Sequence, residues 1–402
     1  MRRSEGRIRT THVGSLVRTP ELVELMIRRW LGEPDDPAAY EEALRAGVSD
    51  VVRRQTGVGI DVVNDGEFGK SNWITYISER MTGITRSERA PRPDATIWPE
   101  QDRFGEFYHR YSEYESVQWL PDTPSRDQYR GRQLEEYSTW ECTGALGYNP
   151  GPLERDIANL SAAVDDLGAE VEEAFMPVVA PCSLEICRNH HYATQEEYLF
   201  ALADALAVEY RMIVDAGFLL QVDDAMLPMQ RFQRFREASE VEYRRWAEVR
   251  VEALNHALAG IPEDRVRYHI CFGSQNVPHT TDPDLRDIID LILRADAQAY
   301  SIEACNPRHE HEWQMWRDVD LPDGKILIPG VVGHATNVVE HPELVALRLK
   351  NFADLVGREN VVAGTDCGFS QSWNSPRVHE QVQWAKLATM VEGARIASDE
   401  LW

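Results

Sequence analysis

Residues 265–272 read RVRYHICF, a short run rich in β-branched and aromatic residues that predicts a β-strand. Runs of similar character recur on both sides of it, at 8–13, 60–64, 175–180, 218–222, 299–303, 326–332 and 361–364. Most of them are continuously apolar rather than alternating, which is typical of strands covered on both faces, as in a parallel sheet. The sequence therefore predicts eight parallel strands.

Helical patterns separate most of these strands. Thr194 precedes an amphipathic stretch, 195–216, that ends before Gly217, a residue suited to a helix C-terminus. Further helices are predicted over 282–297 and 342–355. Eight strand–helix units favour a closed (β/α)8 TIM barrel over an open doubly wound sheet, so we predict one α/β barrel domain over residues 1–402. The chain has no GxGxxG turn and no GK[ST] motif, which argues against a nucleotide-binding fold.

Residues 85–150 interrupt this alternation. They contain six prolines, show no clear helical or strand period, and are rich in aromatic residues, notably over 104–111. This composition is too aromatic for a solvated linker. The segment follows the second strand, so we predict an insertion that packs over the mouth of the barrel and forms an oligomer contact in a homo-oligomer. The alternative is that it packs on the outer helices.

The composition of the chain excludes some classes of binding partner and favours one cellular compartment. The formal net charge is −25, from 42 basic and 67 acidic residues, which opposes binding to nucleic acid or to anionic lipid. No apolar run approaches the roughly 18 residues of a membrane span, and the N-terminus lacks the apolar core of a signal peptide. Six cysteines without a close-set framework are typical of a reducing compartment, so we expect a cytoplasmic protein.

Residues capable of chemistry stand at or beside the end of every predicted strand. In a (β/α)8 barrel the active site lies at the C-terminal ends of the strands. An acid, a histidine or a cysteine occurs at all eight of these ends: His12, Glu67, Cys182, Asp223 with Asp224, Cys271, Glu303, His334 and Cys367. Stability alone would not require this pattern, so we predict a functional site at this rim.

Four residues of the rim form a predicted metal site. His269 and Cys271 are two positions apart, so on an extended strand their side chains face the same way. Glu303 and Cys367 follow the sixth and eighth strands, which are near neighbours around the rim. One imidazole nitrogen, two thiolates and one carboxylate suit tetrahedral Zn²⁺. The alternative is a pair of core cysteines beside a hydrogen-bonded histidine.

The remaining cysteines fit the metal less well. Cys305 lies two positions after Glu303 and is an alternative fourth ligand. Cys142, Cys182 and Cys187 have no partners at ligand spacing and are expected to be buried thiols.

Such a zinc ion is suited to capturing a thiol. Two thiolates already donate charge to the metal, which disfavours a hydrolytic hydroxide, whereas coordination stabilises an incoming thiol as its nucleophilic thiolate. Glu303 is the weakest of the four ligands and is expected to yield to that sulfur. Glu67 together with Asp223 or Asp224 would hold a cationic group of the thiol, such as an α-ammonium; rim salt bridges or helix caps are the alternative.

His334 is the predicted proton donor. An unperturbed histidine titrates near neutral pH, so His334 can protonate the leaving group of an alkyl donor. The alternative is a structural, hydrogen-bonded histidine.

These residues lie in motifs that carry a family resemblance. The motifs are TTHVGS at 10–15, DGEF at 65–68, LQVDD at 220–224, HIC at 269–271, IE at 302–303, GH at 333–334 and DCG at 366–368. They span nearly the whole chain in the family's order. Together they resemble the C-terminal catalytic barrel of cobalamin-independent methionine synthase, and the chain is also similar to the epoxyalkane:coenzyme M transferases of that superfamily.

The resemblance implies a methionine-synthase-like catalytic barrel with zinc on His269, Cys271, Glu303 and Cys367. It also implies that the positions of Ser15, Glu67 and Asp223 hold homocysteine and that His334 assists methyl transfer from a folate. The predicted substrate-binding set also includes His12 and Asp224, which lie in the matching motifs. Asp224 stands where the synthase usually has glutamate.

We therefore expect a zinc-dependent transfer of a methyl or other alkyl group to a small-molecule thiol, with a homocysteine-like thiol favoured by the rim carboxylates. Within the same chemistry the alternative is the opening of an epoxide by a thiol such as coenzyme M, whose sulfonate would call for basic residues. A zinc hydrolase would be a different class of enzyme, and the two sulfur ligands argue against it. The remaining alternative is a barrel with a structural, non-catalytic zinc.

Overall fold

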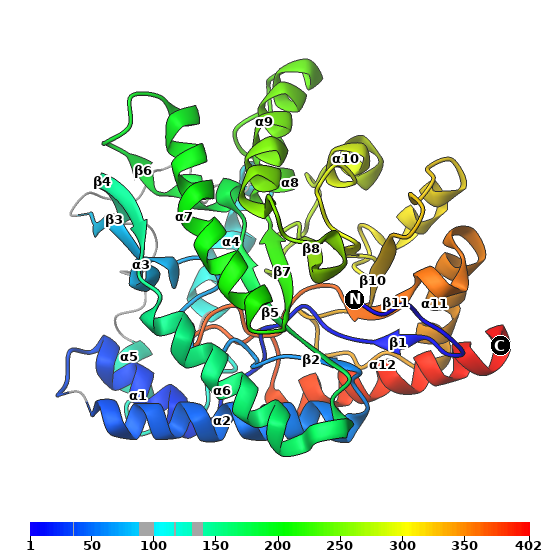
Figure 1. Cartoon of the computed structure of the whole chain (residues 1–402), viewed down its shortest axis with the longest axis horizontal. Coiled ribbons are helices and arrows are strands. Elements are labelled where there is room, and N and C mark those ends of the chain that lie inside the picture. Colours follow the sequence, from blue (N-terminus) through cyan, green and yellow to red (C-terminus); the bar gives the residue numbers. More distant parts are fainter. Residues whose placement is uncertain (35, 88–99, 116–117, 131–139) are drawn as a thin grey trace.

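The structure is a computed structural model that describes residues 1–34, 36–87, 100–115, 118–130 and 140–402. Its centre is a sheet of eight strands surrounded by helices (Figure 1). The order of the strands is β1-β11-β10-β9-β8-β7-β5-β2, and every neighbouring pair is parallel. Their bounds are β1 (Arg9–Thr10), β2 (Val62–Val63), β5 (Glu173–Val179), β7 (Leu219–Asp224), β8 (Val266–Ile270), β9 (Ala299–Ile302), β10 (Ile326–Val332) and β11 (Val362–Thr365).

The sheet curves round until its two ends nearly meet. Its edge strands β1 and β2 are joined by a hydrogen bond from Asp61 N to Thr10 O of 3.1 Å and another from Thr11 Oγ1 to Val62 O of 3.1 Å. The predicted (β/α)8 TIM-barrel class is therefore confirmed, and each of the eight predicted strand runs coincides with a strand of the sheet.

Two apolar zones hold the barrel together. A small cluster that includes Phe175, Leu219 and Ile326 comes from the first residues of the strands and fills one end of the barrel. The large core lies between the strands and the surrounding helices. The other end of the barrel is left to the polar residues that follow each strand, and there the candidate site forms.

Long helices cover the outside of the strands (Figure 1). Thr194 caps the N-terminus of α7 in a reciprocal arrangement: its hydroxyl accepts from the N–H of Glu197, whose carboxylate accepts from the Thr194 N–H. Gly217, with a φ of +92°, follows the end of this helix as the sequence predicts. The bounds of the covering helices are α1 (Pro20–Trp30), α2 (Pro37–Val58), α6 (Gly151–Leu167), α7 (Gln195–Asp215), α8 (Met226–Phe232), α9 (Glu240–Leu258), α10 (Leu285–Ile292), α11 (Pro342–Val356) and α12 (Glu380–Leu401).

The helix predicted over 282–297 is shorter in the structure. Helix α10 covers only Leu285–Ile292. Asp282 does not start it, because its carboxylate binds the buried rings of His279 and His309 at 2.8 and 3.1 Å. The carboxylate of Glu312 instead accepts a hydrogen bond from the first helical N–H, that of Leu285, at 2.6 Å.

The segment predicted as an insertion is partly regular. It contains helix α4 (Gln101–Glu115), short helix α5 (Arg126–Arg130) and strand β4 (Trp140–Tyr148), elements that its sequence pattern did not reveal. Strand β4 pairs with β3 (Met81–Arg86) and β6 (Arg188–Asn189) in a second sheet, preceded by the short helix α3 (Ile77–Arg80). Residues 88–99, 116–117 and 131–139 of the predicted insertion lie outside the described residues. None of the described helices combines the length and apolar character of a membrane-spanning segment.

Candidate metal centre and active site

Three of the four predicted metal ligands come together at the polar end of the barrel. The donor atoms of His269, Cys271 and Cys367 all lie within 4.8 Å of one another, and all three side chains are buried. The two sulfur atoms are 3.5 Å apart. His269 is in β8, Cys271 immediately follows this strand, and Cys367 lies two residues beyond β11. This group of one nitrogen and two sulfurs could hold a metal ion.

The orientation of His269 fits a metal. Its Nδ1 is 3.1 Å from the Ser301 hydroxyl, whereas its buried Nε2 has no hydrogen-bond partner. A polar atom buried without a partner is costly unless a ligand satisfies it. Burial lowers the pKa of His269 to about 3, which keeps the ring in the neutral form that binds metals. Ser301 pairs with His269 across β8 and β9, and such an outer hydrogen bond fixes the ring in place.

The electrostatic surroundings of the two cysteines favour their protonated forms in the absence of a positive charge. The hydrogen bond between the two sulfurs, followed by burial, raises the pKa of Cys271 well above its usual value. A bound cation reverses this balance, because coordination stabilises both thiolates. Two N–H donors already point at the sulfurs: Gly273 N lies 3.3 Å from Cys271 Sγ, and Gln371 Nε2 lies 3.6 Å from Cys367 Sγ.

The structure does not bring Glu303, the fourth predicted ligand, into this group. Its carboxylate accepts hydrogen bonds from the N–H of Phe272, at 2.9 Å, and from Asn306 Nδ2, at 3.3 Å. Burial, followed by the negative charge of Asp366, raises the pKa of Glu303 to about 7. Glu303 thus lies beside the group, and its carboxylate accepts a hydrogen bond from the residue after Cys271.

Cys305, the alternative fourth ligand, is also outside the group. Its thiol donates a hydrogen bond to the carboxylate of Asp366 at 3.0 Å. The same carboxylate accepts from the N–H groups of Ala304 and Cys305, at 2.8 and 3.0 Å. Burial and the charge of Asp366 raise the Cys305 pKa well above its usual value. The six cysteines of the chain all lie within the described residues, and all are free of disulfides.

Two of the predicted substrate-binding acids face each other. Asp223 pairs with His269 across β7 and β8, which places it beside the metal group. Its pKa is raised well above the usual range by burial and next by the charge of Glu67. Glu67 Oε2 is buried without a hydrogen-bond partner, and its closest cation, Lys70 Nζ, is 3.8 Å away. A buried pair of carboxylates with an unpartnered oxygen is well suited to an ammonium group.

Asp224 is in a different situation. Both oxygens of its carboxylate are already used, one by the Leu227 N–H at 3.0 Å and the Ser183 hydroxyl at 3.4 Å, the other by the Tyr268 hydroxyl at 3.0 Å. These bonds tie the end of β7 to the start of α8. The geometry therefore favours a structural role for Asp224, as a cap of the turn into α8, and a ligand-binding role for Asp223.

Ser15 lies directly against the loop that carries Cys367. A Cβ atom added to Gly368 would lie 2.0 Å from the Ser15 hydroxyl, so only glycine permits this approach. The carbonyl of Ser15 also accepts the N–H of Phe369 at 2.8 Å. The first and last loops of the barrel are thus joined beside the metal group.

His12 occupies a buried hydrogen-bonded position. Its Nε2 is 2.8 Å from Gln55 Oε1, and its ring packs edge-on against Phe175 at 5.7 Å. Burial lowers its pKa to about 4, so the ring is neutral. Below it, the buried guanidinium of Arg267 donates to the His12 carbonyl at 3.0 Å and to Thr11 Oγ1 at 3.0 Å. Arg267 was not among the predicted site residues, although it lies two positions before His269 and faces the same way.

His334 is buried and neutral. Its Nε2 is 3.2 Å from the carbonyl of Ser274, so this nitrogen carries the proton, and its Nδ1 has no partner. Burial, followed by the positive charge of Arg377, lowers its pKa to about 3. The predicted role of His334 as proton donor assumes a pKa near neutrality, whereas in the structure the ring is neutral and its Nδ1 can accept a proton.

Helix α4 packs over this end of the barrel. Tyr108 and Phe104 join an apolar cluster with Cys271, Cys367 and Met229. Glu100, just before α4, fastens the helix to the loop after β8 by accepting from the N–H groups of His279, at 3.1 Å, and Thr280, at 2.6 Å, and from the Tyr108 hydroxyl.

Comparison with known proteins agrees with these motifs. A family profile described as "Cobalamin-independent synthase, Catalytic domain" matches residues 8–91 and 184–395. The chain is 24% identical to a methionine synthase of Sulfolobus acidocaldarius, over 98% of this chain and 93% of the relative. It is 21% identical to the 2-hydroxypropyl-CoM lyase of Xanthobacter autotrophicus, over 93% of this chain and 90% of the relative.

A solved structure shares the fold. The B12-independent methionine synthase of Shewanella sp. W3-18-1, in complex with selenomethionine, superposes with a TM-score of 0.67 and 18% identity, covering 98% of this chain and 99% of that one. The family profile covers well over half of the chain, in the two segments that contain all the ligand motifs. The resemblance predicted from those motifs is confirmed: the chain belongs to the catalytic-domain family of cobalamin-independent methionine synthase.

Proposed function

We propose that this protein transfers a methyl or other alkyl group to the sulfur of an amine-bearing thiol of the homocysteine class, with Zn²⁺ held by His269, Cys271 and Cys367. The observation that carries the proposal is the buried group of one imidazole and two sulfurs with an unpartnered His269 Nε2. Soft sulfur donors with one imidazole favour zinc among common metals. When bound, zinc lowers the pKa of a coordinated thiol and holds it as the nucleophilic thiolate.

The grouped imidazole and two sulfurs leave the fourth position to a carboxylate, a donor that a thiol can replace, which supports a catalytic rather than a structural ion. Glu303 is our proposed fourth ligand in the absence of thiol. Its carboxylate lies beside Phe272, the neighbour of Cys271, and it would give way to the sulfur of a substrate.

The rest of the thiol substrate is positioned by the neighbouring strand ends. The carboxylates of Asp223 and Glu67 bind its α-ammonium group, and this contact relieves the repulsion between them. Ser15 supplies a hydroxyl beside Cys367. We assign His12 and Asp224 to positioning: His12 steadies the first strand end through Gln55, and Asp224 fixes the turn into α8.

The transfer balances without a further reactant. The bond between sulfur and the alkyl carbon forms and the bond between that carbon and its leaving atom breaks. The thiol releases its proton to solvent on binding, and an equivalent proton from solvent ends on the leaving group. We assign the movement of this proton to His334, because its unpartnered Nδ1 can accept a proton while its Nε2 is held by the Ser274 carbonyl.

The alternative within this chemistry is epoxide opening by a sulfonate thiol, which the similarity to 2-hydroxypropyl-CoM lyase favours. Against it stands the acidic pair Asp223 and Glu67, which attracts an ammonium and repels a sulfonate.

Isothermal titration of the zinc-loaded protein against homocysteine, cysteine, glutathione and coenzyme M tests the proposal. We expect homocysteine to bind most tightly and to release a proton, seen as a dependence of the heat on the ionisation enthalpy of the buffer. Tighter binding of coenzyme M would favour the epoxide alternative. Absence of binding by every thiol would contradict the proposal and leave the metal structural.

A further inference from the structure

A second group of buried titratable side chains lies against the loop after β8. The group joins this loop to the loop after β9 through two histidines and two carboxylates, and none of the four has a role in the proposed transfer. Buried charges are retained only where they are paired, so the partners of this group indicate its role. Its members are His279, Asp282, His309 and Glu312.

His309 is held between the two carboxylates. Its Nδ1 is 2.8 Å from Glu312 Oε2, and its Nε2 is 3.1 Å from Asp282 Oδ2. An ionised carboxylate only accepts hydrogen bonds, so both ring nitrogens donate, and a histidine that donates from both nitrogens is an imidazolium. Burial alone would lower the pKa of His309, but these two hydrogen bonds outweigh it and raise the pKa to about 10. His309 is therefore a buried cation at neutral pH.

His309 contacts both of the residues that hold the carboxylate of Glu303. Its ring lies flat against that of Phe272, with the centroids 3.9 Å apart and the planes 17° from parallel, so the cation faces an aromatic surface. The N–H of Phe272 donates to one oxygen of Glu303 at 2.9 Å. The N–H of His309 donates to the carbonyl of Asn306 at 2.8 Å, and the side chain of Asn306 donates to the other oxygen of Glu303 at 3.3 Å.

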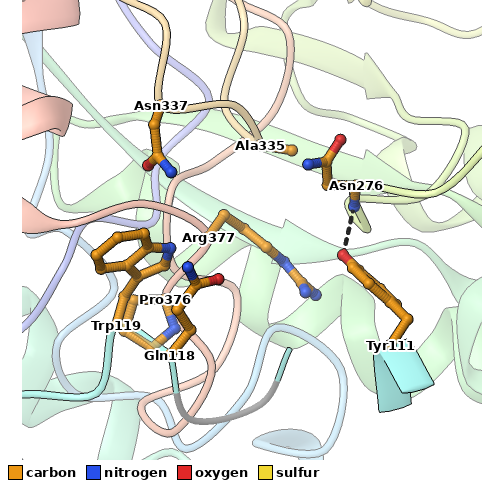
Figure 2. A pocket seen from close by; sticks show the side chains of 8 residues that line it. All are labelled: Tyr111, Gln118, Trp119, Asn276, Ala335, Asn337, Pro376 and Arg377. Atoms are coloured by element: carbon orange, nitrogen blue, oxygen red, sulfur yellow. Dashed lines mark hydrogen bonds between the residues drawn. The ribbon is translucent and has the colours of Figure 1, made fainter. Parts of the chain in front are cut away.

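The loop after β8 is fixed at its far end as well. The Nδ1 of His279 is 2.8 Å from the same Asp282 oxygen that His309 contacts. His279 also has a φ of +54°, a conformation that costs free energy in a residue other than glycine and that the surrounding contacts must hold in place. Helix α4 adds a contact of its own, because the N–H of Asn276 donates to the Tyr111 hydroxyl at 2.9 Å (Figure 2).

We propose that His309 is a positioning residue for Glu303, the fourth zinc ligand of the proposed function, on which this inference rests. The stacked ring of Phe272 and the backbone bond to Asn306 fix the two donors that orient the Glu303 carboxylate. The positive charge of His309 also attracts this carboxylate. His309 acts on the metal only through these neighbours. Without it, Glu303 is free to turn away from the zinc, while the imidazole and the two sulfurs of the group stay in place.

A double-mutant cycle on zinc affinity tests the inference. Zinc binding is measured by competition with a chromophoric chelator for the wild-type protein, His309→Gln, Glu303→Ala and the double variant. Glutamine keeps a neutral N–H donor for Asp282 but has neither the charge nor the ring of histidine. We expect each single change to weaken zinc binding at least about tenfold. The double variant should bind zinc as tightly as Glu303→Ala, because positioning has no effect once the carboxylate is absent.

His311→Gln is the matched control, because it makes the same substitution in an exposed histidine two positions away. Its zinc affinity should equal that of the wild type. Phe272→Leu is a second variant that decides the question if His309→Gln does not fold, since it removes the stacked ring and leaves both hydrogen bonds of the His309 ring in place. It should also weaken zinc binding, and this effect should vanish when Glu303→Ala is present. Thermal unfolding shows which variants are folded.

The pattern of results separates this inference from the proposed function. If Glu303→Ala weakens zinc binding but neither His309→Gln nor Phe272→Leu does, the inference fails and the proposed ligand set stands. A loss from His309→Gln that is equal with and without Glu303 would also overturn the inference, because a general structural role acts in both backgrounds. If Glu303→Ala itself leaves zinc affinity unchanged, Glu303 is not a ligand, and the proposed fourth ligand and the inference are both wrong.

Discussion

Replacing Cys367 with serine is expected to weaken zinc binding by at least about 100-fold and to reduce alkyl transfer to homocysteine by roughly a thousand-fold. Serine keeps the size of the side chain but is not a thiolate, so the group loses one of its two sulfurs. Zinc content after dialysis and the rate of product formation measure the two effects. Cys271→Ser should behave in the same way, because the two sulfurs stand 3.5 Å apart in one group.

Cys305→Ser is the matched control for this prediction. It makes the same substitution near the same site, and a serine hydroxyl can donate to Asp366 as the thiol does at 3.0 Å. We expect this variant to keep its zinc and most of its activity. Loss of zinc in Cys305→Ser with retention in Cys367→Ser would exchange the roles of the two cysteines and contradict the proposed ligand set.

Asp223→Asn is expected to raise KM for homocysteine at least about 100-fold and to stabilise the protein by about 1 kcal/mol. Both effects have the same cause. The raised pKa means that the ionised Asp223 carboxylate, buried and beside Glu67, costs free energy in the folded state at neutral pH. An asparagine cannot ionise, and its oxygen can still accept the hydrogen bond that Gln221 donates at 2.9 Å. Substrate titration and thermal unfolding measure the two results.

The adjacent residue provides the control. Asp224→Asn makes the same change in an equally buried side chain, but there both carboxylate oxygens accept hydrogen bonds. An asparagine supplies one acceptor where Asp224 supplies two, so we expect a loss of stability of about 1–2 kcal/mol. Destabilisation by Asp223→Asn without a change in KM would show that Asp223 is structural and would contradict its proposed role.

The affinity for homocysteine should also depend on pH through Asp223. Protonation removes the charge that binds the ammonium, so affinity falls as pH decreases. Because the pKa of Asp223 is raised, this fall begins closer to neutrality than an ordinary aspartate would produce. Asp223→Asn should lack this component of the pH dependence.

The barrel could be predicted from sequence because each strand is a buried run whose position is fixed by its own composition. The run that contains Val266 and Ile270, and its counterparts, all became strands of one sheet. Helix α10 was predicted too long because its limits depend on distant partners: His309 binds Asp282 and Glu312 caps Leu285. No local pattern contains those contacts.

The site was predictable to the extent that strand alternation determines it. The spacing of His269 and Cys271 was sufficient to place both on one face, and Cys367, predicted as a ligand from its place after the eighth strand, lies beside them. The position of Glu303 could not be predicted, because its carboxylate is held by the Phe272 N–H. That N–H lies within hydrogen-bond distance only when β8 and β9 are in register. Ser301 was missed for the same reason, because it is identified as the partner of His269 only after that register is known.

X-ray absorption at the zinc edge, on the zinc-loaded protein before and after addition of homocysteine, tests the central claim most directly. The claim is that the group of His269, Cys271 and Cys367 holds zinc with a position open to a thiol. We predict that the number of sulfur neighbours at about 2.3 Å rises from two to three, with the loss of one oxygen. An unchanged shell with two sulfurs at saturating homocysteine would contradict it.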